Sequence, residues 1–411
     1  MSTTNQGSNT SNGDFAMTDK SVEVVWNALN KFNVELPSWG FANTGTRFGK
    51  FIQLAAATNI EEKFSDAAQV HAVTGACPTM ALHVQWDLPN GVKDVGKVEK
   101  LAKRFSIQPG STNPNVFQNQ EYKYGSLGNP DPSIRRAAIR HILDCVEISD
   151  ALGSRDISPW FADGSNYPGT QNIRTRIGYF EEGLKEVHAA MKPGQRLLVE
   201  YKPFEPAFYH TDIADWGMAY LLAKEAGPQA SVLVDTGHHY QSQNVEQIVA
   251  WLLHKDMMGG FHFNDRRYAD DDLTLGSIDP YQIFRIFHEL QSSQSDGLPP
   301  EGVAFMIDQS HNDKGKIEAT VQTVVTAQEL WLKAALLDRE QLAVHQQSCD
   351  IVAAEELFRG AFWTDVRPLT IAWRQGQGLP VDPIAALREG GYVERAAQER
   401  GSRQSAVSSY A

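Results

Sequence analysis

SVLVDTG, residues 231–237, is a short β-branched run that ends in an aspartate and a glycine. Segments with helical periodicity lie on either side of it, at 213–226 and 245–255. A second apolar run, MGGFHFN at 258–264, follows the second helical segment. A strand, a helix and another strand in this order are typical of a parallel sheet with helices on both faces.

The same alternation extends outward through most of the chain. Eight runs read as strands: 34–40, 79–86, 105–110, 156–161, 196–202, 231–237, 258–264 and 303–309. Further helical segments lie at 134–152 and 173–191. Eight such units predict an α/β fold of the closed (β/α)₈ (TIM) barrel type. We expect a disordered lead-in and first helix at 1–33, the barrel at 34–315, and a helical extension with a disordered tail at 316–411, where 317–342 is the clearest helix and packs on the barrel or on a neighbouring subunit.

Composition narrows the class of protein. The chain has 411 residues, 42% of them hydrophobic, which is enough for a large core. Its net charge of −13 and the absence of a basic cluster argue against a nucleic-acid partner. No stretch approaches the ~20 apolar residues of a membrane span, and three widely spaced cysteines fit a reducing compartment. We therefore expect a cytoplasmic protein with no membrane partner.

Polar residues stand at the ends of the expected strands, where a barrel of this kind carries its active site. They are Glu200 and Lys202, Asp235 and His238, His262, and Asp308 and His311, with His83 and Trp160 after two earlier strands. The strand starts are mostly apolar. The polar groups are therefore predicted to converge on one rim.

The first expected cluster is Glu200, Asp235, His262 and Asp308. Three carboxylates at one barrel mouth would not all ionise without a cation, because mutual repulsion raises their pKa values. Oxygen ligands with one imidazole suit Mg²⁺ or Mn²⁺.

A second cluster is expected in His238, Asp270 and Asp272, the two aspartates lying in the stretch FHFNDRRYADDDL at 261–273. If Glu200 lies between the clusters, each of its oxygens can hold one ion, which gives a two-metal site with the ions ~4 Å apart.

Each of these residues has a simpler interpretation when taken alone. The aspartate run is typical of a solvated loop, His238 of a core or capping residue, and Asp308 of a helix cap. Glu200 and Lys202 share a strand face and could form a buried ion pair, while Trp160 and His83 could be structural. Their joint placement on the ends of neighbouring strands favours metal binding.

The chain also resembles a known family. The ordered segments SWGFANTGTRF, YKYGSL, DGSNYPG, EYKPFEPAFY, LVDTGHH, GGFHFNDRRYADDDL and MIDQSHN resemble those of the broad-specificity L-rhamnose isomerases, relatives of the xylose isomerases. The resemblance extends from about residue 35 to about 380. It implies a homotetrameric, metal-dependent aldose–ketose isomerase of carbohydrate metabolism with two divalent ions per subunit, Mn²⁺ first, with Mg²⁺, Co²⁺ or Zn²⁺ as alternatives.

The resemblance also assigns roles to residues. It implies a structural ion on Glu200, Asp235, His262 and Asp308, and a catalytic ion on Glu200, His238, Asp270 and Asp272. It places Lys202 near the sugar O1, His83 near the ring oxygen and Trp160 in the wall of the sugar site, with Glu200 and Asp308 also touching the sugar. The implied reaction interconverts L-rhamnose and L-rhamnulose through a metal-bound water and hydrogen transfer between C2 and C1, with D-allose and D-psicose as a second pair.

Two segments depart from the family pattern, and other functions stay open. Gln85 stands where the family commonly has proline, and residues 51–67 differ in a region that the resemblance places against a neighbouring subunit. The preferred sugar is open among L-rhamnose, D-allose, L-mannose and L-lyxose, and hydride transfer competes with an enediol. The alternatives are another sugar isomerase or a C3 epimerase on the same barrel, a metal-stabilised binding or scaffold protein, and a metal-dependent phosphodiesterase or endonuclease, the last opposed by the negative charge.

Overall fold

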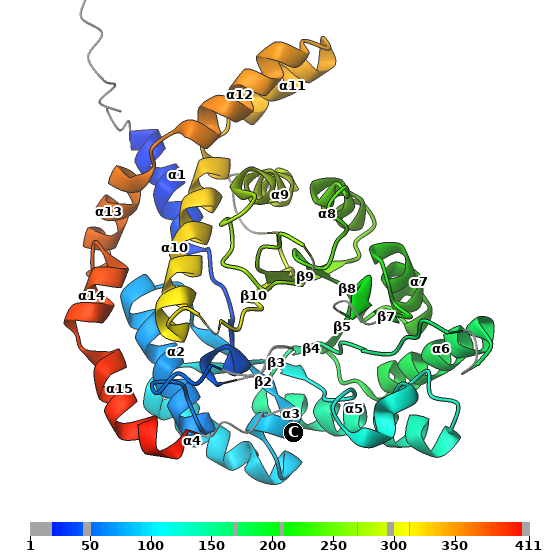
Figure 1. The fold of residues 1–411 in the computed structure, drawn as a ribbon. Helices are drawn as coiled ribbons and strands as arrows, with labels where there is room; N and C mark the ends of the chain where they lie inside the picture. The colour runs from blue at the N-terminus through cyan, green and yellow to red at the C-terminus, as the bar shows by residue number, and fades with distance from the viewer. Residues whose placement is uncertain are drawn as a thin grey trace, which may run out of the picture.

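The computed structural model describes residues 19–43, 51–167, 171–205, 209–268, 270–293, 300–311 and 313–404. Eight parallel strands form its central sheet (Figure 1). In sheet order they are β1 Leu36–Pro37, β2 Thr79–His83, β3 Gln108–Asn113, β4 Asp156–Ile157, β5 Arg196–Glu200, β8 Ala230–Asp235, β9 Met258–Phe263 and β10 Ala304–Ile307. The first and last strands meet through a parallel bridge between Glu35 and Met306, so the sheet closes into the predicted barrel.

The register of the strands places their ends at one level. Asp235 at the end of β8 pairs with His262 in β9, and Glu200 at the end of β5 pairs with Leu233. Because parallel strands present their carboxyl ends at the same rim, these side chains are brought together by backbone pairing alone.

The barrel interior and the outer shell are packed separately. Leu198, Leu233 and Met306 form a small apolar cluster apart from the main core between strands and helices. Glycine is needed at position 259 in β9, where a Cβ atom would lie 2.6 Å from the Leu198 side chain.

Helices cover the outside of the barrel (Figure 1). The main ones are α1 Asp19–Asn30, α2 Ile60–Thr74, α4 Val95–Phe105, α5 Pro132–Leu152, α6 Ile173–Ala190, α7 Trp216–Ala226, α8 Val245–His254 and α9 Pro280–Ser292. Shorter elements are η1 Ser38–Phe41, α3 Val84–Asp87, η2 Gly91–Asp94, η3 Gln120–Tyr124 and a two-stranded hairpin, β6 Phe204–Glu205 with β7 Tyr209–His210. Asn244 and Asp279 cap α8 and α9 with their side chains, which satisfies backbone amides at those helix starts.

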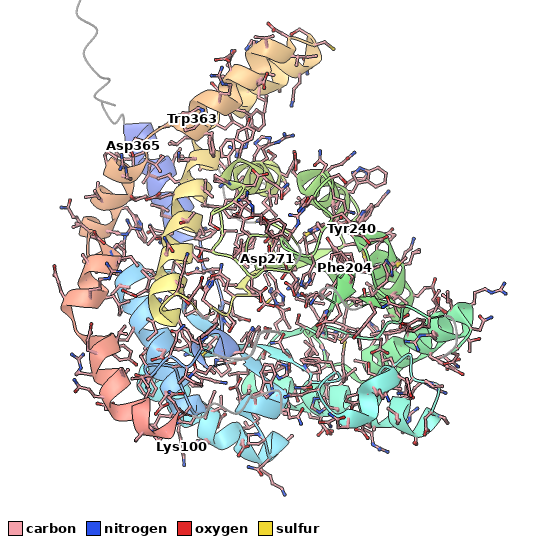
Figure 2. All side chains as sticks on the ribbon, in the orientation of Figure 1. Lys100, Phe204, Tyr240, Asp271, Trp363 and Asp365 are labelled. Atoms are coloured by element: carbon pink, nitrogen blue, oxygen red, sulfur yellow. The ribbon has the colours of Figure 1, made fainter. Side chains whose placement is uncertain are left out.

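The C-terminal extension is helical, as predicted. It consists of α10 Lys316–Ala335, α11 Arg339–Gln347, α12 Ile351–Trp363, α13 Arg367–Gly376, α14 Pro383–Glu389, α15 Tyr392–Arg400 and η4 Gly401–Arg403. α10 packs against α9, α1 and α2, whereas α11 and α12 project from the body with Trp363 at the base of the projection (Figures 1 and 2). Among the described helices, none is both long and apolar enough to cross a membrane.

Several predicted boundaries were wrong: the strands expected at 34–40, 79–86 and 156–161 are shorter, and two further elements differ for a clear physical reason. The helix expected at 317–342 ends at Ala335, because Asp338 caps a new helix by accepting a hydrogen bond from the Gln341 amide. The strand expected at 105–110 lies at 108–113, because α4 continues to Phe105 and ends at Ser106 in the left-handed region (φ 57°). The lead-in at 1–18 and the tail at 405–411 lie outside the described residues.

Candidate active site

The first predicted cluster assembles at the rim. Glu200, Asp235, His262 and Asp308 each offer one ligand atom, and these atoms all lie within 4.8 Å of one another. His262 Nδ1 lies 3.1 Å from Glu200 Oε1, 3.7 Å from Asp308 Oδ2 and 4.0 Å from Asp235 Oδ2. Four donors from four neighbouring strand ends therefore surround one point.

The charges of this cluster are those of a cation site. Burial, reinforced by the charges of Glu200 and Asp308, raises the pKa of Asp235 to about 7. Burial alone would lower the pKa of His262, but the facing carboxylates raise it to about 9. His262 and a second histidine, His238, hold the pKa of Glu200 at about 2 in spite of its burial. A divalent ion at this point would offset the same negative charge.

Neighbouring groups orient the Asp235 and Asp308 carboxylates. Asn264 Nδ2 lies 3.0 Å from each oxygen of Asp235, and the Gly237 amide donates to Asp235 Oδ1 at 2.7 Å. Trp39 in η1 donates from Nε1 to Asp308 Oδ1 at 2.7 Å. Such contacts fix the carboxylates in the direction that a metal ion requires.

The second predicted cluster lies beside the first. His238 Nδ1 lies 3.0 Å from the carbonyl oxygen of Tyr201, and its Nε2 lies 3.3 Å from Asp270 Oδ1. Donation from Nδ1 to that carbonyl leaves Nε2 as the coordinating nitrogen. Burial and the charge of Asp270 raise the pKa of Asp272 well above its usual value, as expected for a carboxylate that a divalent ion would stabilise. Asp272 is held in the left-handed region (φ 48°).

Glu200 lies between the clusters. Its Oε1 is 3.1 Å from Nδ1 of His262 and 3.3 Å from Nδ1 of His238. The donors on both sides are carboxylates and imidazoles, which fit Mg²⁺, Mn²⁺ or a similar divalent ion and include no thiolate. The residues present therefore suit the metal that the sequence predicts.

Lys202 does not pair with Glu200, the simple structural alternative. Its Nζ lies 2.6 Å from Asp270 Oδ2, 3.1 Å from Glu205 Oε2 and 4.8 Å from the centre of the Trp160 ring. Burial lowers the pKa of Lys202, but Asp270 and Glu205 outweigh it and raise the pKa above its ordinary value. The side chain is therefore a fixed ammonium at the rim.

An aromatic cluster stands beside the carboxylates and contains both His83 and Trp160. The His83 ring stacks on Trp86 with centroids 3.6 Å apart and meets Trp39 and Phe117 edge-on. Phe117 in turn meets Trp160 at 4.9 Å. His83 Nδ1 and Trp160 Nε1 are buried without a hydrogen-bond partner among the described residues. Buried polar atoms of this kind are expected to be satisfied by a bound polar molecule.

Burial, followed by the charges of Lys63 and His141, lowers the pKa of His83 well below its usual value, so the imidazole is neutral. Its backbone amide donates to Asp87 Oδ2 at 2.8 Å, and Lys63 Nζ lies 2.6 Å from Asp87 Oδ1. These contacts fix the end of β2 and with it the ring.

Two polar residues near the rim do not belong to either cluster. Asp271 accepts hydrogen bonds from the backbone amides of Arg267 and Tyr268 at 2.8 and 2.7 Å, so it shapes the loop near the barrel centre (Figure 2). His311 faces Gln309 at 3.4 Å, and burial lowers its pKa to about 4. Asp308 does not cap α10, whose N-cap is Gly315.

Reasoning from the sequence missed several supporting residues. Trp39, Asn264 and Phe117 were not singled out, although Trp39 and Asn264 lie in the segments SWGFANTGTRF and GGFHFNDRRYADDDL. The signal for Asn264 was present: it stands two residues after a proposed ligand, on the same strand end.

The chain is similar to several known proteins. A family described as xylose isomerase-like TIM barrel matches residues 83–294. A probable sugar isomerase of Rhizobium meliloti is 39% identical over 92% of this chain and 89% of its own length. An L-rhamnose isomerase of Bacteroides thetaiotaomicron is 25% identical over 53% of each chain. Among solved structures, a 3-keto-D-glucoside 4-epimerase from E. coli aligns with a TM-score of 0.52 and 13% identity, over 74% of this chain and 99% of that one.

Proposed function

The chain belongs to the xylose isomerase-like TIM barrel family, and we propose that it is a metal-dependent aldose–ketose isomerase. The observation that carries this proposal is the position of Glu200 between two clusters of carboxylate and imidazole donors, 3.1 Å from His262 and 3.3 Å from His238. Two divalent ions held there would act as Lewis acids toward the sugar oxygens. Glu200, Asp235, His262 and Asp308 would hold one ion, and Glu200, His238, Asp270 and Asp272 the other.

Lys202 has the position and charge to stabilise an oxyanion. Its ammonium is fixed by Asp270 and Glu205 and packs over Trp160. In an isomerisation between C1 and C2, negative charge develops on O1 or O2, and a fixed cation lowers the energy of that state more than the energy of the substrate. We assign Lys202 to this role near O1.

His83 and Trp160 serve the sugar in a different way. The neutral His83 ring can exchange a proton at Nδ1 with a sugar hydroxyl or ring oxygen, which would assist ring opening. The aromatic rings of Trp160, Phe117 and Trp86 suit the apolar face of a sugar and exclude water from the reacting carbons.

We propose L-rhamnose and its ketose as the main substrate pair and D-allose as a second. An aromatic cluster of this kind suits the methyl group of a 6-deoxy sugar, and a relative at 25% identity is an L-rhamnose isomerase. Discrimination of one hydroxyl from one methyl group in such a site is worth only ~1–3 kcal/mol, so several aldoses are expected to react.

The test is metal-dependent turnover. The protein is stripped with a chelator, Mn²⁺ is added back, and conversion of L-rhamnose and of D-allose to their ketoses is followed by chromatography. Conversion that returns only with the metal supports the isomerase. In a parallel assay with a ketose such as D-psicose, an epimerised ketose formed without any aldose would assign an epimerase instead. Metal binding without turnover of any of these sugars would contradict both.

A further inference from the structure

The last described residues of the chain bind back onto a loop at the barrel rim. We call residues 400–404 the strap and residues 51–58 the rim loop. Arg400 Nη1 donates to the carbonyl of Ala55 at 2.7 Å, and Gln404 Nε2 donates to the carbonyls of Ala56 at 2.6 Å and Leu54 at 3.3 Å. Three consecutive carbonyls of the rim loop thus depend on two side chains of the strap, since irregular backbone has no ladder partner of its own.

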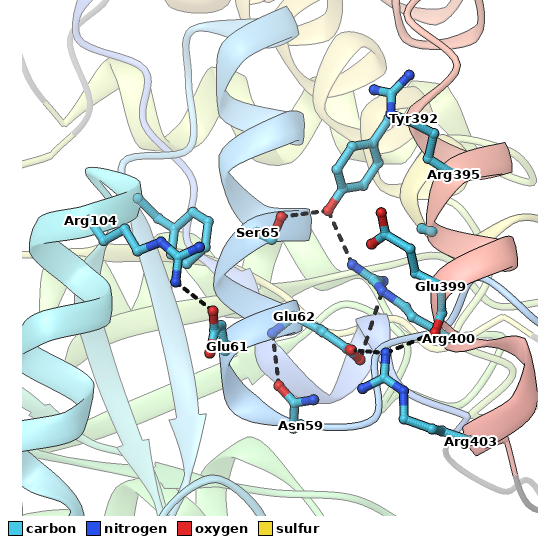
Figure 3. Close-up of a pocket in the computed structure, with 12 residues that line it drawn as sticks. Asn59, Glu61, Glu62, Ser65, Arg104, Tyr392, Arg395, Glu399, Arg400 and Arg403 are labelled. Carbon is cyan, nitrogen blue, oxygen red and sulfur yellow. Dashed lines mark hydrogen bonds and ion pairs between the residues drawn. The ribbon is translucent and has the colours of Figure 1, made fainter.

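The strap itself is anchored on α2 (Figure 3). Both terminal nitrogens of Arg400 lie 2.9 Å from the Asp66 carboxylate, and the two side chains are 5% and 0% exposed. Tyr392 also donates to Asp66, at 2.8 Å. A buried bidentate pair of this kind is costly to break, because one partner would be left as an uncompensated charge.

A cavity of about 370 Å³ lies between α2 and α15 at this anchor (Figure 3). Its charged walls are matched: Arg403 pairs with Glu62 at 2.6 Å and Arg104 with Glu61 at 2.5 Å. These two pairs join α2 to η4 and to α4, and they favour a role in holding these elements together over a role in binding a charged ligand.

The rim loop continues the connection to the site. Gln53 donates to the carbonyls of His311 at 3.1 Å and Lys314 at 2.7 Å, in the segment that follows Asp308. At its other end, Ala57 donates from its backbone amide to the Phe41 carbonyl at 2.8 Å. Asn43 joins the parts, since its Nδ2 lies 2.7 Å from Gln404 Oε1 and 3.1 Å from the Gln53 carbonyl.

The contacts of Gln53 and of Ala57 both lead to the carboxylate of Asp308. Phe41 closes η1, whose Trp39 donates to Asp308 Oδ1 at 2.7 Å, and His311, whose carbonyl accepts from Gln53, lies three residues after Asp308. We propose that Arg400 and Gln404 are positioning residues for Asp308, acting through the rim loop, so that the end of the chain sets the affinity of the first donor cluster for its divalent ion. The dependence on Asp308 as a metal ligand rests on the proposed function.

The first test measures hydrogen exchange in metal-free protein. Gln404→Ala removes the two hydrogen bonds from Gln404 to Leu54 and Ala56 without uncovering a buried charge. Gln398→Ala, at an exposed glutamine on α15, is the matched control. We expect amide exchange within 51–58 to become at least about tenfold faster in Gln404→Ala, while β9 exchanges as in the wild type. Gln404→Lys, which keeps a donor for the same carbonyls, should restore most of the protection.

The second test measures the tighter Mn²⁺ dissociation constant by calorimetric titration. We expect this constant to rise about fivefold or more in Gln404→Ala and in Arg400→Lys. A lysine at position 400 cannot bind the Asp66 carboxylate and the Ala55 carbonyl together. In turnover assays KM should rise, and kcat should return at saturating Mn²⁺, which a general loss of folding would not allow.

Unchanged amide exchange at 51–58 in Gln404→Ala would contradict the proposal that the strap holds the rim loop in place. Faster exchange with wild-type Mn²⁺ affinity would overturn its connection to Asp308. Neither measurement requires that the sugar be known, so failure of the isomerase proposal would be seen separately, in the turnover assay.

Discussion

The Asp270 carboxylate is shared: its Oδ2 lies 2.6 Å from Lys202 Nζ, while its Oδ1 lies 3.3 Å from His238 Nε2. One oxygen therefore holds a cation of the protein, and the other faces the second donor cluster. The pair keeps Lys202 charged, because Asp270 and Glu205 raise its pKa against the effect of burial. A permanently charged lysine is suited to stabilising an oxyanion and not to removing a proton.

Replacement of Lys202 tests this role. Lys202→Met keeps the volume of the side chain and removes the ammonium, so we expect kcat/KM to fall by about 10²–10³. Steady-state kinetics together with elemental analysis will check it, since metal content should stay at the wild-type level. Lys185→Met, an exposed lysine paired with Glu225, is the control. Loss of metal in parallel with loss of activity would assign Lys202 a structural role instead.

The shared position of Glu200 predicts the metal count of two further variants. Glu200→Gln should remove or greatly weaken both ions and abolish turnover, because one side chain serves both clusters. Asp272→Asn should keep the first ion and lose the second. Metal per chain is measured after dialysis against Mn²⁺. Asp271→Asn is the control, since Asp271 binds the backbone amides of Arg267 and Tyr268 and belongs to neither cluster. Two ions retained in Glu200→Gln would contradict the proposal that Glu200 is a ligand of both.

The barrel could be predicted because its signal is local. Apolar runs of strand length alternate with helical periodicity, and the ends of these runs carry the proposed ligands, as Asp235 follows three consecutive apolar positions. Parallel pairing then brings Asp235 beside His262 without further information.

The supporting contacts could not be predicted, because they join distant parts of the sequence. Trp39 and Asp308 are 269 positions apart, and Gln404 lies 348 positions from Ala56. Neither tryptophan nor glutamine carries a pattern that names its partner. The break in the helix expected at 317–342 was missed for another reason: Asp338 lies within an otherwise continuous helical pattern, and its role as a cap is visible only in the hydrogen bond to Gln341.

Acid should destabilise the protein through His288 of α9. Burial and the nearby charges of Arg339 and Arg285 lower the pKa of His288 to about 4, against ~6.5 in an unfolded chain. The unfolded state therefore binds more protons between these values, so stability rises with pH across that window and is lost as pH falls through it. The full contribution of His288 to the free energy of unfolding is about 3 kcal/mol, at about 1.4 kcal/mol for each pKa unit.

Urea unfolding at pH 7 and pH 4 measures this contribution as a difference between variants. Between the two pH values, His288→Gln should lose about 3 kcal/mol less of its free energy of unfolding than the wild type. Because both proteins contain the proposed metal-binding histidines, the titration of those residues cancels in the difference. His254→Gln, at the exposed end of α8, serves as the reference. Equal losses in all three proteins would show that His288 does not stay neutral.

Arg266 supports the loop that carries His238. Its guanidinium donates to the carbonyls of His239 at 2.7 Å, Tyr240 at 2.8 Å and Thr236 at 3.3 Å. A planar group with several donors can serve three carbonyls at once, and a lysine ammonium on a flexible stem cannot do so in the same geometry. We therefore expect Arg266→Lys to displace His238 from Asp270 and to weaken the second ion by about 10–100-fold, while the first ion is retained.

Titration of the metal-free variant with Mn²⁺ checks this prediction, because the tighter and weaker binding events should respond differently. kcat at limiting Mn²⁺ should fall with the weaker event and recover as the metal is raised. Arg267 is exposed and follows Arg266 in the chain, and Arg267→Lys should behave as the wild type. If Arg266→Lys weakens both events equally, Arg266 supports the whole rim; if it weakens neither, the three carbonyl contacts do not position His238.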